Sequence, residues 1–284
     1  MSISSSSILV ELNISVWTAN KLDKRITNDV LVSNGATKAD AGQFRKNLMS
    51  GSTLRKDIAD FAASCRLWHN TMTLPWADRG PRLLPTSLFF DYKTELNKRK
   101  ARFDHMVEHF EREYPQLCAD APMHLGAMYD PADYPSVNEM RSKFGFRTVF
   151  TPLPEAGDFR LDIANDDLEL MKQQYETALN ERVGEAMQSQ WDKLHDMVAR
   201  MSDKLVEPDG DDKRRWHDTF ITNAREMCSM LTHLNVTKDP KLEEARRKLE
   251  LAVHGVDIED IKDDAVVRED VKEKLDAILK DYEW

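Results

Sequence analysis

The sequence reads TSLFFDYKTELNKRKARFDHMVEHFEREYP at residues 86–115 and NDDLELMKQQYETALNERVGEAMQSQWDKLHDMVARMSDKL at residues 165–205. In both stretches apolar residues recur at steps of three and four, the spacing of one helix face. The first face comprises Phe89, Tyr92, Leu96, Phe103, Met106 and Phe110, and the second comprises Leu168, Met171, Tyr175, Leu179, Ala186, Leu194, Met197 or Val198, Met201 and Leu205. This pattern predicts two long helices that form an antiparallel coiled-coil seam, the first ending at Pro115.

Between the two helices, apolar residues alternate with others in two short runs. Phe144, Phe146, Thr148 and Phe150 form the first run, and Phe159, Leu161 and Ile163 form the second. Alternation of this kind predicts a β-hairpin at the tip of a helical arm that spans residues 86–206. Residues 1–85 and 207–284 would then form a helical body, with Pro208-Asp209-Gly210 at the boundary.

The predicted body begins with a strand, because residues 8–17 alternate cleanly between apolar and polar side chains. Residues 18–33 are expected to form a second strand or an irregular arm. Further helices are expected over about 37–48 and 53–73, and after residue 212 in three C-terminal segments. The predicted fold class is therefore mainly α (α+β), a helical body and a long antiparallel arm tipped by a β-hairpin, with one N-terminal strand.

The amino-acid composition of the chain disfavours several classes of function. The 284 residues are 41% hydrophobic and 32% charged, with a formal net charge of −10. An acidic chain lacks a general attraction for phosphate backbones, although a local basic patch remains compatible with it. The three cysteines are far apart in sequence, which disfavours a disulfide framework or a cysteine zinc site. Without a signal peptide or a long apolar run, the chain is expected in a cytoplasm and away from membranes.

The sharpest catalytic motif is His105-x-x-Glu108-His109. On a helix its histidines share a face, and the spacing matches the zinc motif of inverted zincin peptidases. That chemistry needs a third ligand, for which Glu169 or Glu176 would be candidates. The surrounding charges predict exposed surface histidines instead. The common nucleotide-binding and hydrolase signatures do not occur, so no cofactor is expected and a non-enzymatic protein is favoured.

Basic and aromatic residues suggest a possible contact surface at the arm's tip. The candidates for an interaction or nucleic-acid contact are Phe144, Phe146, Arg147, Phe150 and Arg160. Single-stranded nucleic acid is bound by such combinations through stacking and phosphate contacts. The alternative is that the rings pack within the hairpin's core, which is the more common use of aromatic side chains.

Three segments carry a resemblance to a known group of proteins. They are ILVELNISVWTANKLDKRIT at 8–27, LPWADRGPRLLP at 74–85 and MYDPADYP at 128–135. Together they resemble a family of uncharacterised tailed-phage proteins, which brings no activity or catalytic residues with it. The resemblance implies a viral protein in the host cytoplasm. Members of related families lie beside genes for ring-forming ATPases, which suggests a phage or host protein such as a ring ATPase as a partner.

Three functional hypotheses follow. The first is a non-enzymatic tailed-phage protein that assembles into a homo-oligomer and serves as an interaction or scaffold protein. The second is a single-stranded DNA-binding accessory factor in phage replication or recombination. The third is a zinc metallopeptidase that uses His105, Glu108 and His109.

Overall fold

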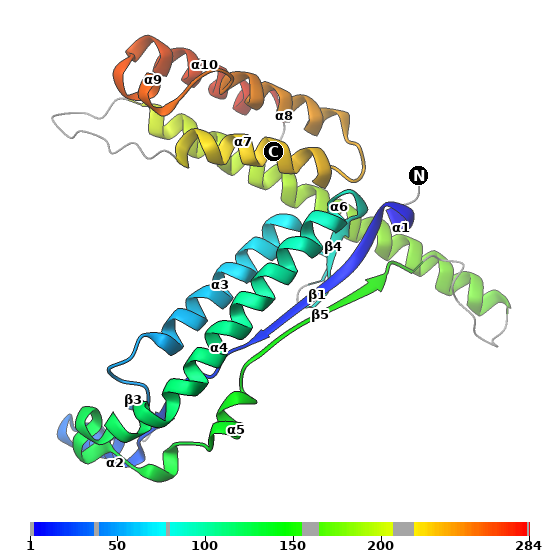
Figure 1. Ribbon diagram of the computed structural model, residues 1–284. Coiled ribbons are helices and arrows are strands. Elements are labelled where there is room, and N and C mark those ends of the chain that lie inside the picture. Colours follow the sequence, from blue (N-terminus) through cyan, green and yellow to red (C-terminus); the bar gives the residue numbers. More distant parts are fainter. Residues whose placement is uncertain (1–2, 37–39, 78–79, 155–164, 207–218, 283) are drawn as a thin grey trace. The chain divides into compact units, whose positions relative to one another are not determined.

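The computed structural model describes residues 3–36, 40–77, 80–154, 165–206, 219–282 and 284. The fold is mainly α with a small amount of β structure, as predicted (Figure 1). In chain order the elements are α1 (Ile3–Ser6), β1 (Ser7–Ser15), β2 (Asn20–Leu22), α2 (Lys24–Ser33), β3 (Arg45–Asn47), α3 (Leu54–Met72), β4 (Arg82–Pro85), η1 (Thr86–Leu88), α4 (Phe89–Leu125), η2 (Gly126–Met128), η3 (Pro131–Asp133), α5 (Val137–Arg141), β5 (Gly145–Pro152), α6 (Asn165–Leu205), α7 (Thr219–Leu234), α8 (Pro240–Ala252), α9 (Ile258–Asp263) and α10 (Ala265–Asp281). Within the described ranges, none of these helices has the length and apolar character needed to cross a bilayer.

The chain divides into two compact units, each assembled from separate segments. Unit 1 comprises Met1–Glu11, Asn70–Tyr92 and Val149–Trp284. Unit 2 comprises Leu12–His69 and Lys93–Thr148. The segments of the two units alternate along the chain. The predicted body consisted instead of two long segments, and the predicted arm of one.

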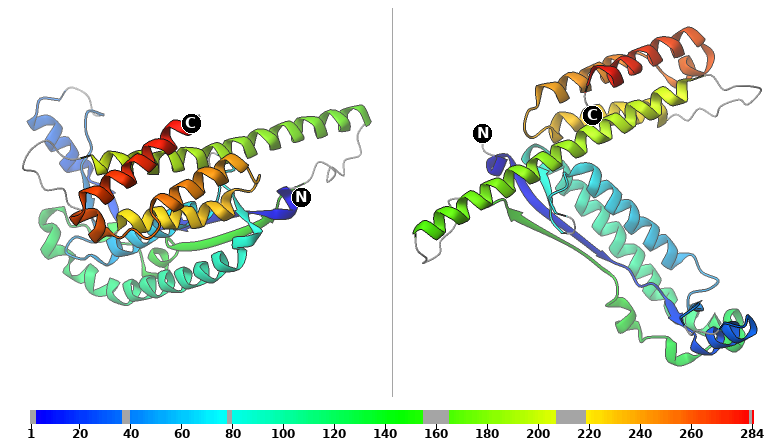
Figure 2. Two further views of the ribbon diagram at one scale, coloured as in Figure 1. Left: turned by 90° about the horizontal axis from the view of Figure 1, so that it is seen from above. Right: turned by 180° about the vertical axis from the view of Figure 1, so that it is seen from behind.

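Unit 1 contains a helical bundle in which α7, α8 and α10 pack around the second half of α6 (Figures 1 and 2). Its core is made of fully buried aliphatic side chains, which include Leu194, Val198, Leu231, Leu242, Leu249 and Leu275. The first half of α6 differs, because no side chain between Asp167 and Glu185 is fully buried. The long helix predicted over 165–205 is thus confirmed, and its buried face packs against the C-terminal helices.

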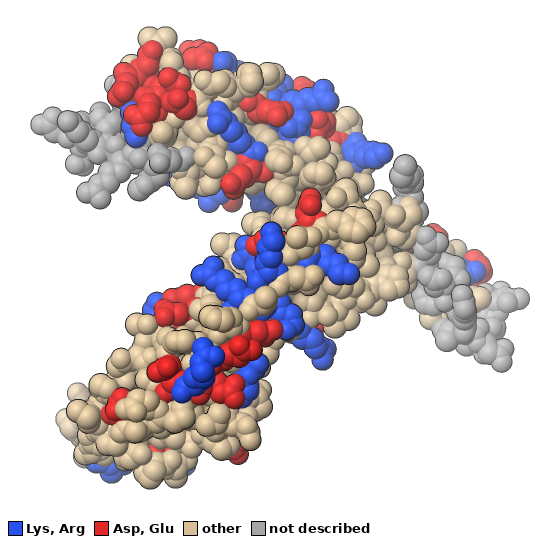
Figure 3. Space-filling model, in the orientation of Figure 1, with Lys and Arg blue, Asp and Glu red and all other residues tan. Residues whose placement is uncertain are grey.

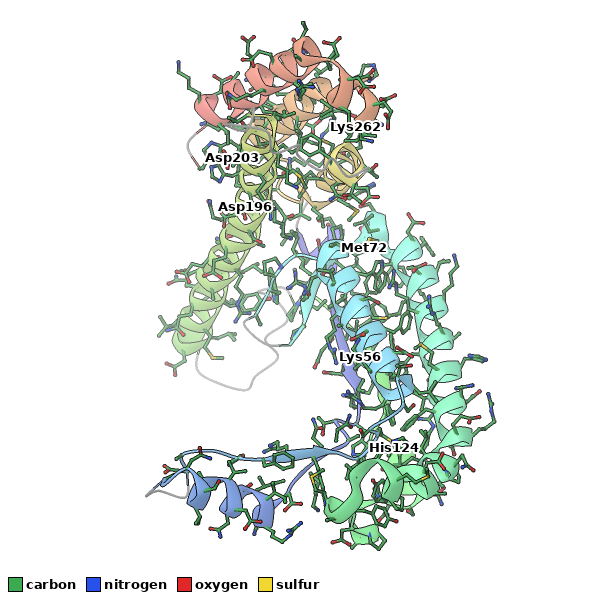
Figure 4. The ribbon with its side chains drawn as sticks, turned by 90° about the vertical axis from the view of Figure 1, so that its left-hand side faces the viewer. Lys56, Met72, His124, Asp196, Asp203 and Lys262 are labelled. Carbon is green, nitrogen blue, oxygen red and sulfur yellow. The ribbon has the colours of Figure 1, made fainter. Side chains whose placement is uncertain are left out.

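Unit 2 is built on α3 and α4, which run side by side (Figures 1 and 4). Their facing side chains form one core with the segment that leads into β5, through Ile58, Ala62, Phe103, Phe110, Met140 and Phe144. The coiled-coil interpretation placed residues 165–205 against this face of α4, and the structure places α3 there. Spacing therefore identified both long helices but assigned the wrong partner to α4, because a periodic face does not specify what covers it.

The first long helix also continues beyond its predicted end. Pro115 and Pro122 both lie inside α4, which ends at Leu125. A proline inside a helix removes one backbone hydrogen bond and crowds the preceding turn. Downstream burial offsets that cost, because Ala121 and Leu125 are only 2% and 6% exposed. Just before the first proline, the Tyr114 hydroxyl donates a hydrogen bond to the Pro135 carbonyl at 2.9 Å.

The segment from residue 18 to residue 48 departs most from the prediction. Residues 24–33 form the helix α2, where a strand or an arm was expected, and Asp23 caps it by accepting a hydrogen bond from the Ile26 amide at 3.0 Å. The helix expected over 37–48 is wrong for its last part, because β3 pairs antiparallel with β2. Burial of Lys46 in β3 between acidic partners fixes this strand, a long-range contact that local spacing does not reveal.

The three-stranded sheet has the order β4–β1–β5. Strand β1 confirms the predicted N-terminal strand, and its Ser7 lies opposite Pro85 while Val10 lies opposite Arg82. Strand β5 confirms the first predicted strand of the tip, although its neighbour here is β1. The predicted second strand of the hairpin, at 159–163, lies outside the described residues.

A positive φ explains why residue 51 is glycine. Gly51 has φ +90°, a backbone conformation that L side chains rarely adopt. A Cβ atom there would also lie 2.7 Å from the His124 Nε2 atom, but the His124 side chain is exposed and can turn away. We expect Gly51→Ala to lower the free energy of unfolding by about 1–3 kcal/mol through backbone strain. Gly184→Ala is the control, since Gly184 lies inside α6 with open space around it. Urea denaturation should show a loss of stability for Gly51→Ala and none for Gly184→Ala, and equal stabilities would rule out backbone strain at residue 51.

Candidate nucleic-acid interface

The His105–Glu108–His109 motif lies on α4, as predicted. All three side chains are exposed. Within the described ranges, no group of three or more histidine, cysteine, aspartate or glutamate side chains is arranged to hold a metal ion. In the structure these three residues therefore lie on an exposed surface of α4.

The aromatic residues proposed for the tip are packed against other rings. Phe144 is 5% exposed, and its ring centroid lies 5.7 Å from that of Phe110. Phe146 contacts Phe103 at 5.6 Å, both in unit 2. The hydrophobic contacts of these rings correspond to the core-packing alternative.

The other three tip candidates have different surroundings. Phe150 belongs to unit 1, where its ring centroid lies 5.5 Å from that of Phe89 and 6.2 Å from that of Tyr92. Arg147 is exposed on β5. Arg160 lies outside the described residues. The candidates thus do not form one exposed aromatic surface in the described structure.

Charge is distributed unevenly between the two units. Unit 2 has 18 lysines and arginines against 14 aspartates and glutamates, a net charge of +4. Unit 1 has 22 against 36, a net charge of −14. Acidic side chains are conspicuous over α9 and α10 (Figure 3), and Glu259, Asp263, Asp264 and Asp270 are exposed there. Unit 2 therefore carries a net positive charge although the whole chain is acidic.

In unit 2, two arginines of α4 lie over aromatic rings of α3. The Arg99 Cζ atom is 4.8 Å from the centroid of the Trp68 ring, and the Arg102 Cζ atom is 4.7 Å from that of Phe61. Both distances are within the range of cation–π contacts. Together with Lys98, these residues form what we call the Arg–aromatic face.

The remaining contacts of this face leave positive charge available. Arg102 and Lys98 are exposed, and both rings are half-buried. Arg99 has an acidic neighbour one turn earlier, with its Nε atom 2.8 Å from the Glu95 Oε1 atom. Lys98 makes no ion pair with any residue that the structure describes. The face therefore combines planar guanidinium groups, aromatic rings and an unpaired cation.

The sequence contained part of this signal. Phe61 and Trp68 are seven residues apart, and Arg99 and Arg102 are three apart, so each pair shares one side of its helix. The sequence also has a basic run at Lys98, Arg99, Lys100 and Arg102, but the aromatic residues predicted for an interaction lie near Phe146. Only the packing of α3 beside α4 brings the arginines and rings together.

Comparison with known proteins adds no assignment. The chain matches no protein family, no curated protein and no solved structure.

Proposed function

We propose that the protein is a non-enzymatic binding protein that contacts single-stranded nucleic acid through the Arg–aromatic face of unit 2. The observation that carries the proposal is the pair of guanidinium–aromatic stacks, Arg99 on Trp68 and Arg102 on Phe61, in a unit with a basic excess. In the setting suggested by the resemblance to tailed-phage proteins, this activity would serve phage replication or recombination in the host cytoplasm.

The chemistry of the face suits an unpaired strand. A guanidinium group that lies over a ring on one side can present its other side to a nucleobase, and bases stack on arginine planes as they do on aromatic rings. Phosphate groups between the bases would contact Lys98 and the guanidinium N–H groups. Stacking contributes roughly 1–3 kcal/mol per base and tolerates any sequence, so the expected activity has little base preference.

Replacing the two stacked arginines tests the proposal. We expect Arg99→Ala with Arg102→Ala to weaken binding of a single-stranded oligonucleotide by about 100-fold, because two stacking and charge contacts of roughly 1–3 kcal/mol are removed. Arg112→Ala is the matched control, since Arg112 is an exposed arginine farther along α4. Fluorescence anisotropy measures the affinities. An equal loss of affinity in Arg112→Ala would mean that the effect comes from net charge alone, and it would contradict binding at a defined face.

Self-association is a second candidate, favoured by the opposite net charges of the two units. The basic unit of one copy would bind the acidic unit of another, and a ring ATPase partner could use the same acidic surface. Complementary charges accelerate association and are weakened by salt. Light scattering should then give a mass above 32.8 kDa at low salt that falls toward that value as salt is added. A monomer at every salt concentration would exclude this candidate.

A further inference from the structure

The two arginines of the Arg–aromatic face differ in their electrostatic surroundings. The Nε atom of Arg99 is buried and lies 2.8 Å from the Glu95 Oε1 atom, one turn earlier on α4. Arg102 is exposed and forms no ion pair with another residue in the described part of the chain. One guanidinium group is therefore partly neutralised by a carboxylate, whereas the other keeps its full positive charge.

The two guanidinium groups also differ in what a ligand can reach. The Arg99 side chain is 23% exposed, and its Cζ atom lies 4.8 Å from the centroid of the Trp68 ring. Trp68 lies against one side of this group and Glu95 lies at its Nε edge, so the opposite side is the surface that a flat ligand can cover. Arg102 lies over Phe61 at 4.7 Å, where α3 and α4 run side by side (Figure 4), and its exposed N–H groups can reach a phosphate.

A carboxylate beside a guanidinium group changes which part of a nucleic acid that group binds. Phosphates are attracted by positive charge, and the negative charge of Glu95 opposes that attraction at Arg99. A nucleobase carries no net charge and stacks through its π-face, so Glu95 affects base stacking on Arg99 much less. The contacts of Arg99 thus suit a base, and those of Arg102 and Lys98 suit phosphates.

We propose that Arg99 binds an unpaired nucleobase and Arg102 binds a phosphate, and that Glu95 gives the Arg–aromatic face its preference for single strands. Inside a duplex the π-faces of the bases are covered by their neighbours, so a duplex presents mainly phosphates to this face. Glu95 weakens the contact of those phosphates with Arg99. This inference rests on the proposed function, because it assigns the selectivity of the same face.

The salt dependence of binding separates the roles of the two arginines. For a single strand, the logarithm of the binding constant falls against the logarithm of the salt concentration by about 0.7 per phosphate contact. We expect Arg102→Ala to make this slope shallower by about 0.7. Arg99→Ala should weaken binding by about tenfold without changing the slope, because it removes a stacked base and no phosphate contact. Equal changes of slope in the two variants would overturn the assignment.

Glu95→Gln tests the selectivity, with anisotropy titrations of the full chain against a single strand and a duplex of the same sequence. The unaltered chain should bind the single strand more tightly. In Glu95→Gln, affinity for the duplex should rise by about tenfold at about 50 mM salt, because Arg99 gains a phosphate contact. Affinity for the single strand should rise clearly less, since a base already occupies Arg99.

Asp104→Asn is the matched control, because it removes the same charge from an ion pair of α4. The Asp104 Oδ2 atom lies 2.5 Å from the Lys100 Nζ atom. Asp104 follows Glu95 by about two and a half helical turns, which places it on the opposite side of α4. Unchanged duplex affinity in Glu95→Gln, or the same increase in Asp104→Asn, would overturn the role of Glu95.

These titrations also distinguish the failure of this inference from the failure of the proposed function. If the unaltered chain binds neither oligonucleotide, both are contradicted. If it binds the single strand but prefers the duplex, or if Glu95→Gln and Asp104→Asn behave alike, only the selectivity assigned to Glu95 is contradicted.

Discussion

Replacing Phe110 by alanine is expected to lower the free energy of unfolding of unit 2 by about 3–5 kcal/mol. Phe110 is 0% exposed. Its ring centroid lies 6.5 Å from that of Trp17, 5.9 Å from that of Tyr114 and 5.7 Å from that of Phe144. Removing the ring would leave a cavity that three neighbouring aromatic rings cannot easily fill, so both the transfer energy and the contacts are lost.

Phe90→Ala is the matched control for this change. It removes the same ring from the same helix, but Phe90 is 79% exposed. We expect its effect on the free energy of unfolding to remain within about 0.5 kcal/mol, as for most surface changes. Hydrogen exchange of the α3 and α4 amides reports the stability of unit 2 directly. Similar protection in the two variants would mean that Phe110 does not lie at the centre of this core.

The second large effect is expected at Lys46, which is 6% exposed in β3. Its Nζ atom lies 2.6 Å from the Asp133 Oδ2 atom and 3.9 Å from the Asp23 Oδ2 atom, and it donates to the Met128 carbonyl at 2.6 Å. Lys46→Met leaves two nearly buried carboxylates without this cation. Removing one partner of a buried ion pair lowers the free energy of unfolding by about 3–5 kcal/mol. Lys21, whose Nζ atom lies 3.7 Å from the Asp133 Oδ1 atom, offsets only part of that loss.

The Lys56–Asp60 pair supplies a control with the same N–O distance on the surface of α3. Its N–O distance is also 2.6 Å, but its two side chains are 68% and 62% exposed. Lys56→Met should therefore change the free energy of unfolding by less than about 0.5 kcal/mol. Adding Asp133→Asn to Lys46→Met should recover part of the loss, because it removes one uncompensated charge. Chemical denaturation of the three variants checks both expectations, and no recovery in the double variant would contradict the electrostatic explanation.

The sequence predicted elements well where one local rule was sufficient. Alternation located β1 and β5, and steps of three and four located α3, α4 and α6. Predictions from the sequence were less accurate where contacts between distant residues determine the structure. Burial of Leu125 lets α4 continue through two prolines, and the Lys46 ion pair stabilises a strand where local propensity suggested a helix.

The candidate interface shows the same limit. The phenylalanines near residue 146 were recognisable as aromatic, but their burial depends on which helix faces them. Arg99 and Arg102 were recognisable as basic, but their rings come from a helix about 30–40 residues earlier in the chain. Residue type therefore identifies basic and aromatic side chains, whereas which of them lie together depends on the packing of α3 against α4.

The most direct test of the central claim is an anisotropy titration of a labelled single-stranded oligonucleotide of about 16 nucleotides with the full chain. At about 50 mM salt we expect saturable binding, which weakens steeply by about 200 mM as phosphate contacts are screened, and which Arg99→Ala with Arg102→Ala weakens by about 100-fold. No anisotropy change at the lower salt concentration, or full binding by the double variant, would contradict the assignment of nucleic-acid binding to this face.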